Sequence, residues 1–150
     1  MLSFLKPAQR FVKGAVAGLA ALALASCDET GGSSGPKIDA SAPVPVALLV
    51  PKGSSNSGDA LLAQSLENAA KLAIADLGDV KIDLRVYATA GDPNTAQAGA
   101  VQAVNEGAKI ILGPVFGEAA NVAATAVAAR NVNVLSFSNN TTIAGGNLFV

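Results

Sequence analysis

Residues able to bind a small polar molecule follow three apolar segments of this 150-residue chain. A serine follows residues 44–50, a Gly-Pro turn leading to a further glycine follows residues 109–112, and a Ser/Asn cluster begins within residues 133–137. Backbone N–H groups at the start of a helix attract anions such as carboxylates, and hydroxyl and amide groups add directional hydrogen bonds. The candidate ligand-binding residues are Ser54, Gly113, Pro114, Gly117, Ser136, Ser138, Asn139 and Asn140.

Catalysis does not fit these residue types. The chain has no histidine, which removes the common general base, the usual zinc ligand and the partner of a nucleophilic serine or cysteine. Gly53 and Gly58 do not form the G-x-G-x-x-G fingerprint of a dinucleotide site, and no Gly-Lys-Ser/Thr occurs. We therefore predict a binding protein that is not an enzyme, with no catalytic residue, no metal and no cofactor.

The balance of charges argues against nucleic acid as a partner. Ten Lys and Arg stand against eleven Asp and Glu, and no run of basic residues occurs beyond the N-terminal segment. A nucleic-acid surface needs an excess of positive charge to neutralise phosphates.

The N-terminal segment has the pattern of a bacterial export signal. Lys6, Arg10 and Lys13 precede an uninterrupted run of small apolar residues from Ala15 to Ala25. A helix of that length covers about 17 Å, well short of the roughly 30 Å hydrocarbon core, so a permanent transmembrane helix fits less well. We predict that residues 1–26 are a signal peptide.

The apolar run ends in Leu24-Ala25-Ser26-Cys27. This tetrad resembles the lipobox of bacterial lipoproteins, in which the cysteine thiol carries diacylglycerol. The resemblance implies that Cys27 is the lipid-attachment residue and anchors the chain on the periplasmic side of the cell envelope, in the inner or the outer membrane. The alternative is an ordinary secretory signal that happens to lie beside a cysteine. In that case the protein is still exported, but it carries no lipid anchor.

The mature chain is predicted to begin with a tether and to continue as a folded domain. Residues 27–43 are rich in Gly, Ser and Pro and too poor in apolar side chains to offset the entropy of ordering them. The folded part is expected over residues 44–150, where strands and helices alternate.

Apolar periodicity and turn residues set the expected elements. The first strand is apolar on both faces, as a strand between two helical layers must be, whereas the second alternates, as an edge strand does. Ser57 or Asp59 is expected to cap the first helix and Gly78 to close it. The predicted strands are Val44–Val50, Ile82–Tyr87, Lys109–Leu112, Asn133–Phe137 and Asn147–Val150, and the helices are about Asp59–Leu77, Pro93–Glu106 and Glu118–Arg130.

The alternation of these strands and helices predicts an α/β fold with a doubly wound parallel sheet in the order 2-1-3-4-5. Ligands of such sheets bind beyond the carboxyl ends of the strands. We expect the loops after the first, third and fourth strands to line this crevice, and the fifth strand to leave the architecture incomplete.

The run Ile111-Leu112-Gly113-Pro114, together with the lipobox, the tether and the sheet order, resembles the type 1 periplasmic binding proteins of the leucine-binding-like group. This resemblance covers about residues 44–150. It implies most of the first of two lobes that close on a small polar ligand, usually an amino acid or amide, and deliver it to an ABC transporter permease.

A second branch of this fold stays open as an alternative. Residues 113–124 contain no Ser or Thr, whereas amino-acid receptors of the family usually place a hydroxyl there. Residues 135–140 and 143–147 look more like the penicillin-binding protein activators, envelope lipoproteins of the same fold. That reading implies a peptidoglycan synthase as the partner in place of a solute.

Overall fold

The computed structural model describes residues 35–150, so the predicted signal peptide, Cys27 and the first part of the predicted tether lie outside the described residues. Five parallel strands form one sheet in the order β2-β1-β3-β4-β5, which confirms the predicted topology. The strands are β1 (Val44–Val50), β2 (Ile82–Ala88), β3 (Ile110–Leu112), β4 (Asn133–Leu135) and β5 (Leu148–Phe149). The helices are α2 (Ser57–Ala75), α3 (Pro93–Asn105) and α4 (Gly117–Val127), with 3-10 turns η1 (Ala128–Arg130) and η2 (Thr141–Ile143).

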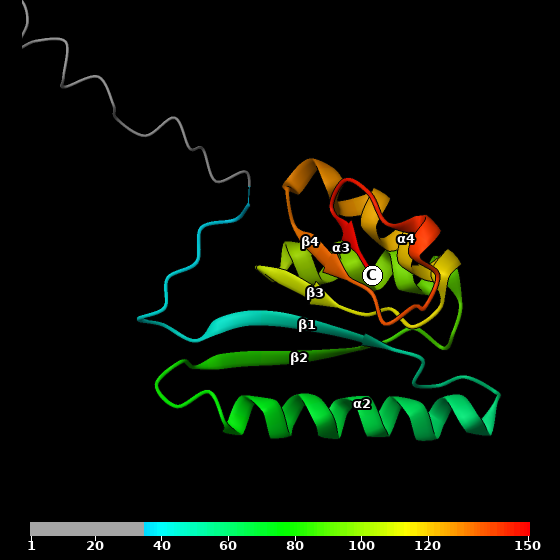
Figure 1. The fold of residues 1–150 in the computed structure, drawn as a ribbon, viewed down its shortest axis with the longest axis horizontal. Helices are drawn as coiled ribbons and strands as arrows, with labels where there is room; N and C mark the ends of the chain where they lie inside the picture. Colours follow the sequence, from blue (N-terminus) through cyan, green and yellow to red (C-terminus); the bar gives the residue numbers. More distant parts are fainter. Residues whose placement is uncertain (1–34) are drawn as a thin grey trace, which may run out of the picture. The chain divides into compact units, whose positions relative to one another are not determined.

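Strand β1 lies in the interior of the domain and separates two hydrophobic clusters. Its side chains alternate between the faces of the sheet, as in any strand. Ala47 and Leu49 belong to the cluster that includes residues of α3 and α4, and Leu48 and Val50 belong to the cluster with α2. The helices therefore cover opposite faces, with α2 on one and α3 and α4 on the other (Figure 1).

Alanines let α3 and α4 pack closely together on their face of the sheet. Ala100 and Ala103 of α3 and Ala120 and Ala123 of α4 are all fully buried in one cluster. Small side chains allow two helix backbones to approach each other and the strands beneath them. These alanines are core residues, and their abundance in the sequence is explained by packing.

Strand β1 pairs with β2 over seven residues, from Val44 opposite Ile82 to Val50 opposite Ala88. Val44 N donates to Lys81 O, so the even-numbered residues of β1 bond to β2 and the odd-numbered ones face β3. Pro45, which has no N–H, is therefore on the β3 side, before β3 begins. Only its carbonyl is needed there, and it accepts from Lys109 N at 2.9 Å.

Several helix boundaries differ from the sequence prediction. Helix α2 begins at Ser57 because Asn56, and neither Ser57 nor Asp59, is its N-cap: Asn56 Oδ1 accepts from Gly58 N at 2.9 Å. This helix ends at Ala75 with Asp76 as the C-cap, three residues before Gly78. In the structure, the predicted third helix is divided into α4 and the tighter 3-10 turn η1. The turn ends at Arg130 because the next residue, Asn131, takes up a left-handed conformation (φ 54°).

The later strands are shorter than predicted, and the loop between them is partly ordered. Strand β4 ends at Leu135: Ser136 N still donates to Phe149 O of β5 at 2.8 Å, but Phe137 N leaves the sheet and donates to the Pro114 carbonyl at 3.0 Å. The polar stretch expected to be a plain loop contains η2, whose N-cap Asn140 accepts from Thr142 N at 3.1 Å. Within residues 35–150, no helix is long and apolar enough to cross a bilayer.

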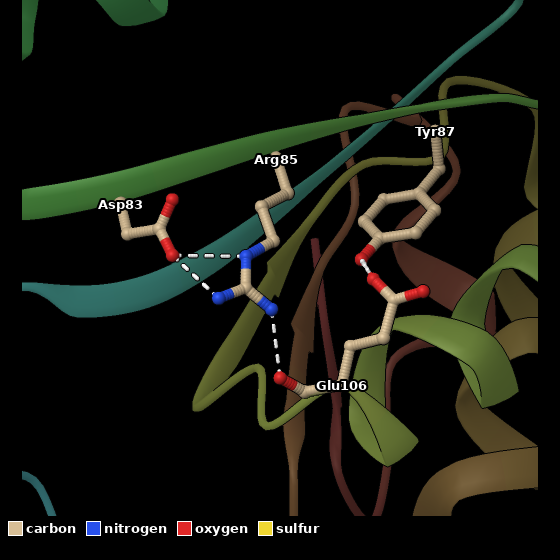
Figure 2. Close-up of polar contacts among 4 residues, drawn as sticks. All are labelled: Asp83, Arg85, Tyr87 and Glu106. Carbon is tan, nitrogen blue, oxygen red and sulfur yellow. Dashed lines mark hydrogen bonds and ion pairs between the residues drawn. The ribbon is translucent and has the colours of Figure 1, made fainter.

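Four polar side chains connect β2 to the end of α3 (Figure 2). Tyr87 Oη donates to Glu106 Oε2 at 2.6 Å. The Arg85 guanidinium is paired with Asp83 on the same strand and donates from Nη1 to the Glu106 backbone carbonyl at 2.7 Å. Burial, and secondly the Glu106 carboxylate, raises the pKa of Tyr87 to about 12. The hydrogen bond from Tyr87 in turn lowers the pKa of Glu106.

Tyr87 is the only tyrosine in the chain, so its ionisation can be followed directly by phenolate absorbance. We expect the folded protein to titrate near pH 12, against about 10 in denaturant, where the ring is solvated. Glu106→Gln removes the carboxylate and should lower the midpoint, with burial keeping it above the denatured value. Circular dichroism at each pH confirms that the fold persists, and a midpoint near 10 in folded protein would contradict this packing.

Candidate functional site

The loops after β1, β2 and β3 come together at Gly91. A Cβ built on Gly91 would lie 3.3 Å from Phe116 Cε2, 3.6 Å from Asp59 Oδ2 and 3.8 Å from Ser54 Oγ. The carboxyl ends of parallel strands share one edge of the sheet, which is why loops distant in sequence meet here. The loops after β1, β3 and β4 were expected to line the crevice, and the loop after β2 also reaches this edge.

The loops after β3 and β4 meet at the first residue of α4. A Cβ on Gly117 would lie 3.4 Å from Ser138 Oγ, 3.6 Å from Ile143 Cδ1 and 3.9 Å from Asn140 Cβ. Three of the predicted ligand-binding residues are thus neighbours in space. Phe116, beside Gly91, directly precedes Gly117 in the chain, so the residues around Gly91 and those around Gly117 adjoin. We call this combined surface the rim.

The Ser54 hydroxyl is already engaged within its own loop. Ser54 Oγ donates to Asp59 Oδ2 at 2.7 Å and accepts from Asn56 N at 3.2 Å. These bonds hold the loop after β1 against the first turn of α2. The structure brings Ser54 to the rim and gives it a structural role there.

Ser136 is likewise occupied. Its Oγ donates to the Pro114 carbonyl at 2.9 Å and accepts from Ser138 N at 3.0 Å. The same carbonyl also accepts from Phe137 N at 3.0 Å. Ser136 therefore joins the loops after β3 and β4, and positions Ser138 beside α4.

Ser138, Asn139 and Asn140 carry the donors that remain available. Ser138 Oγ accepts from Asn140 N at 3.1 Å, and Asn140 Oδ1 accepts from Thr142 N at 3.1 Å. Within the described residues, neither the Ser138 hydroxyl proton nor the Asn140 amide donors take part in a hydrogen bond. The side chain of Asn139 is exposed and also makes no hydrogen bond within residues 35–150.

Gly113 and Pro114 are both buried and shape the turn after β3. Gly113 has φ 85°, and a Cβ on it would clash with the Leu49 carbonyl oxygen. Its N–H donates to Leu135 O at 2.7 Å, and the Gly113–Pro114 peptide bond is cis. Only glycine combines this backbone conformation with so close an approach to β1.

Helix α4 begins at the rim without a side-chain cap. Its N-cap residue is Phe116, which forms no capping hydrogen bond, so the first-turn N–H groups have no side-chain acceptor. Gly117 starts the helix one residue earlier than predicted. This arrangement suits an anionic group such as a carboxylate.

Two aromatic residues and one buried polar residue at this edge were not among the site residues predicted from the sequence. Phe116 and Phe137 remain 39% and 41% exposed. Thr89 is buried, and its Oγ1 donates to Val50 O at 3.1 Å and accepts from Gly91 N at 3.4 Å. In a chain with 4% aromatic residues, a phenylalanine just after a Gly-Pro turn and another between two serines were available signals. The role of Thr89 depends on tertiary contacts.

Other surface features do not coincide with this rim. Two open depressions of about 590 and 580 Å³ lie along α3 and β2, and none of the predicted ligand-binding residues lines them. Residues 35–150 contain no group of three or more side chains suited to holding a metal ion.

Comparison with known proteins agrees with the observed fold. A family model described as periplasmic binding protein matches residues 43–150. No curated protein sequence matches the chain.

Similar solved structures include three bacterial binding proteins. A solute binding protein of an ABC transporter from Rhodopseudomonas palustris, in complex with 3,4-dihydroxybenzoic acid, is 24% identical with a TM-score of 0.59 and 67% of this chain covered. A leucine binding protein from Thermotoga maritima is 17% identical, with a TM-score of 0.61 and 70% covered. An ABC transporter substrate-binding protein from Sphaerobacter thermophilus is 13% identical, with a TM-score of 0.60 and 72% covered. The chain spans 29%, 31% and 32% of these proteins, respectively.

Gly113→Ala should destabilise the domain by about 3 kcal/mol or more, because the left-handed backbone and the clash with Leu49 O both oppose a Cβ. Gly145→Ala is the matched control: no atom lies within 4 Å of a Cβ built there, so we expect a change within about 0.5 kcal/mol. Urea unfolding followed by circular dichroism measures both. Equal stability of the two variants would contradict the close approach of β3 to β1.

Proposed function

Because this chain belongs to the periplasmic binding protein family, we propose that it is part of a cell-envelope solute receptor serving an ABC transporter. Residues 44–150 form most of its first lobe, and a second lobe completes the site. The solute is a small amino acid or amide. The receptor binds it and delivers it to the permease without chemical change.

The convergence of loops at the carboxyl edge of the sheet is the observation that carries this proposal. Gly117 lies beside Ser138 and Asn140, so helix N–H groups, a hydroxyl and an amide face the same region. A ligand with a carboxylate and further polar groups can satisfy all three kinds of donor. Because Ser136 joins the loops after β3 and β4, and Ser54 holds the loop after β1 against α2, little order need be gained on binding.

The ligands named for similar structures support the same chemistry. One neighbour holds 3,4-dihydroxybenzoic acid and another is a leucine binding protein. Both molecules combine a carboxylate with an apolar body. In this chain, the exposed rings of Phe116 and Phe137 can cover an apolar body while the donors at α4 hold the carboxylate.

We further propose that Cys27 anchors the receptor to the membrane through a lipid. Residues 1–26 are then the removed signal, and residues 27–43 keep the domain clear of the headgroups. The support for this arrangement is the lipobox-like tetrad that ends at Cys27 and the Gly/Ser/Pro composition that follows it.

Calorimetry of the full-length, signal-free protein against a panel of amino acids, amides and aromatic acids tests the receptor proposal. We expect a micromolar dissociation constant for one class. Ser138→Ala should weaken it about tenfold, the value of one hydrogen bond to a charged group. Ser65→Ala, a matched change on the exposed face of α2, should leave it unchanged.

Absence of heat with every solute, combined with capture of a peptidoglycan synthase, would overturn the receptor proposal. That outcome would favour the penicillin-binding protein activator alternative. Binding of a solute that is insensitive to Ser138→Ala would keep the receptor function and move the site elsewhere.

Cys27→Ser should release the protein from the membrane fraction, because serine has no thiol to carry diacylglycerol. Fractionation of cells expressing each form, with immunodetection, measures this change. Ser26→Ala keeps the thiol and serves as the control. Equal membrane association of the Cys27→Ser form would show that the anchor lies elsewhere.

A further inference from the structure

Strand β2 is the outermost strand of the sheet on its side, and no further strand pairs with it within the described residues. It is seven residues long and, with β1, one of the two longest strands. It contains neither a proline nor a break in its pairing with β1. Long, regular edges of this kind pair readily with another chain unless something blocks them.

The hydrogen bonds at both ends of the β1–β2 pair show which groups remain on the outer edge. Val44 N donates to Lys81 O, and Thr89 N donates to Val50 O, so the odd-numbered residues of β2 bond to β1. Because a strand alternates, the backbone groups of the even-numbered residues point away from β1. The outward backbone groups belong to Ile82, Leu84, Val86 and Ala88.

The side chains along this edge are of two kinds. Leu84 and Val86 pack against the cluster under α2, so the even-numbered side chains lie on that face. Asp83 and Arg85 lie on the opposite face, and their side chains are 41% and 34% exposed. Figure 2 shows both charged groups on this face of β2, with Arg85 reaching the Glu106 carbonyl and Tyr87 further along the strand.

We propose that β2 is a docking edge for a second copy of this chain, paired antiparallel about a two-fold axis at Leu84. In this register Leu84 faces its counterpart and Ile82 faces Val86 of the other copy, so every hydrogen-bonded pair joins residues with outward backbone groups. Asp83 then lies opposite Arg85 of the other copy, twice by symmetry. Such directly opposed residues have Cβ atoms only about 4.5–5.5 Å apart.

The other two-fold registers fit less well. An axis at Val86 places Arg85 opposite Tyr87 and removes the exchange of charges. An axis at Ile82 shortens the paired length, because the strand begins there. The axis at Leu84 alone combines charge complementarity with pairing along most of the strand.

Charge exchange between two variants tests this register. Arg85→Glu places like charges opposite Asp83, and Asp83→Lys places them opposite Arg85, so each variant should dimerise about tenfold or more weakly than the native protein. In an equal mixture, a heterodimer places the introduced lysine of one variant opposite the introduced glutamate of the other. It also retains one native pair of Asp83 with Arg85, so the mixture should restore dimers. Sedimentation equilibrium on the signal-free protein, with one variant labelled, measures all four samples.

Glu67→Lys and Lys71→Glu are the matched controls, because they reverse the charges of the other ion pair, on α2. Both should dimerise as the native protein does. Native protein that stays monomeric at every concentration would overturn the proposal, as would a mixture of the two edge variants that fails to associate.

Hydrogen exchange on the native protein gives a measurement that needs no variant. The amide protons of Ile82, Leu84 and Val86 should gain protection as concentration rises, whereas those of Asp83 and Arg85, bonded to β1, should be protected throughout. Concentration-dependent protection confined to other elements would place the contact elsewhere and overturn the register.

Discussion

Burial of β1 on both faces of the sheet is the constraint on which the rest of the described structure depends. Residues 47–50 are completely inaccessible to solvent, and a strand in this position needs cover on each side. One helical layer cannot provide it, so α2 must lie on one face and α3 and α4 on the other. The crossovers that achieve this also place β2 and β3 on the two sides of β1, and hence determine the sheet order.

The same strand determines where the rim can form. Gly113 fits directly against the carbonyl of Leu49, which brings the turn after β3 to the end of β1. Ser136 then holds the next loop to that turn through the Pro114 carbonyl. The rim is therefore an extension of the buried sheet, and its available donors, on Ser138 and Asn140, are positioned by residues such as Ser136 whose own polar groups are already bonded.

The edge of the sheet and the rim are different surfaces. The rim lies at the ends of the strands, whereas the outer edge of β2 runs along their length. Pairing at β2 would leave the rim accessible. The polar contacts of Arg85 and Tyr87 with Glu106 attach the edge strand to α3, so this edge is held firmly even though, within residues 35–150, only β1 pairs with it.

The sequence by itself determined the elements, the fold class and the strand order, because apolar periodicity and turn residues act locally. Val44–Val50 could be recognised as a buried strand from its composition alone, and the second helix could be predicted to begin at Pro93, as α3 does. The same patterns placed Gly117, Ser138 and Asn140 at strand ends that share one edge.

Only the tertiary structure decided which polar groups there are already hydrogen-bonded: Ser54 to Asp59, and Ser136 to Pro114. It also brought Gly91 and Phe116 to the rim. Such choices depend on distances between segments far apart in the chain, which no local pattern encodes.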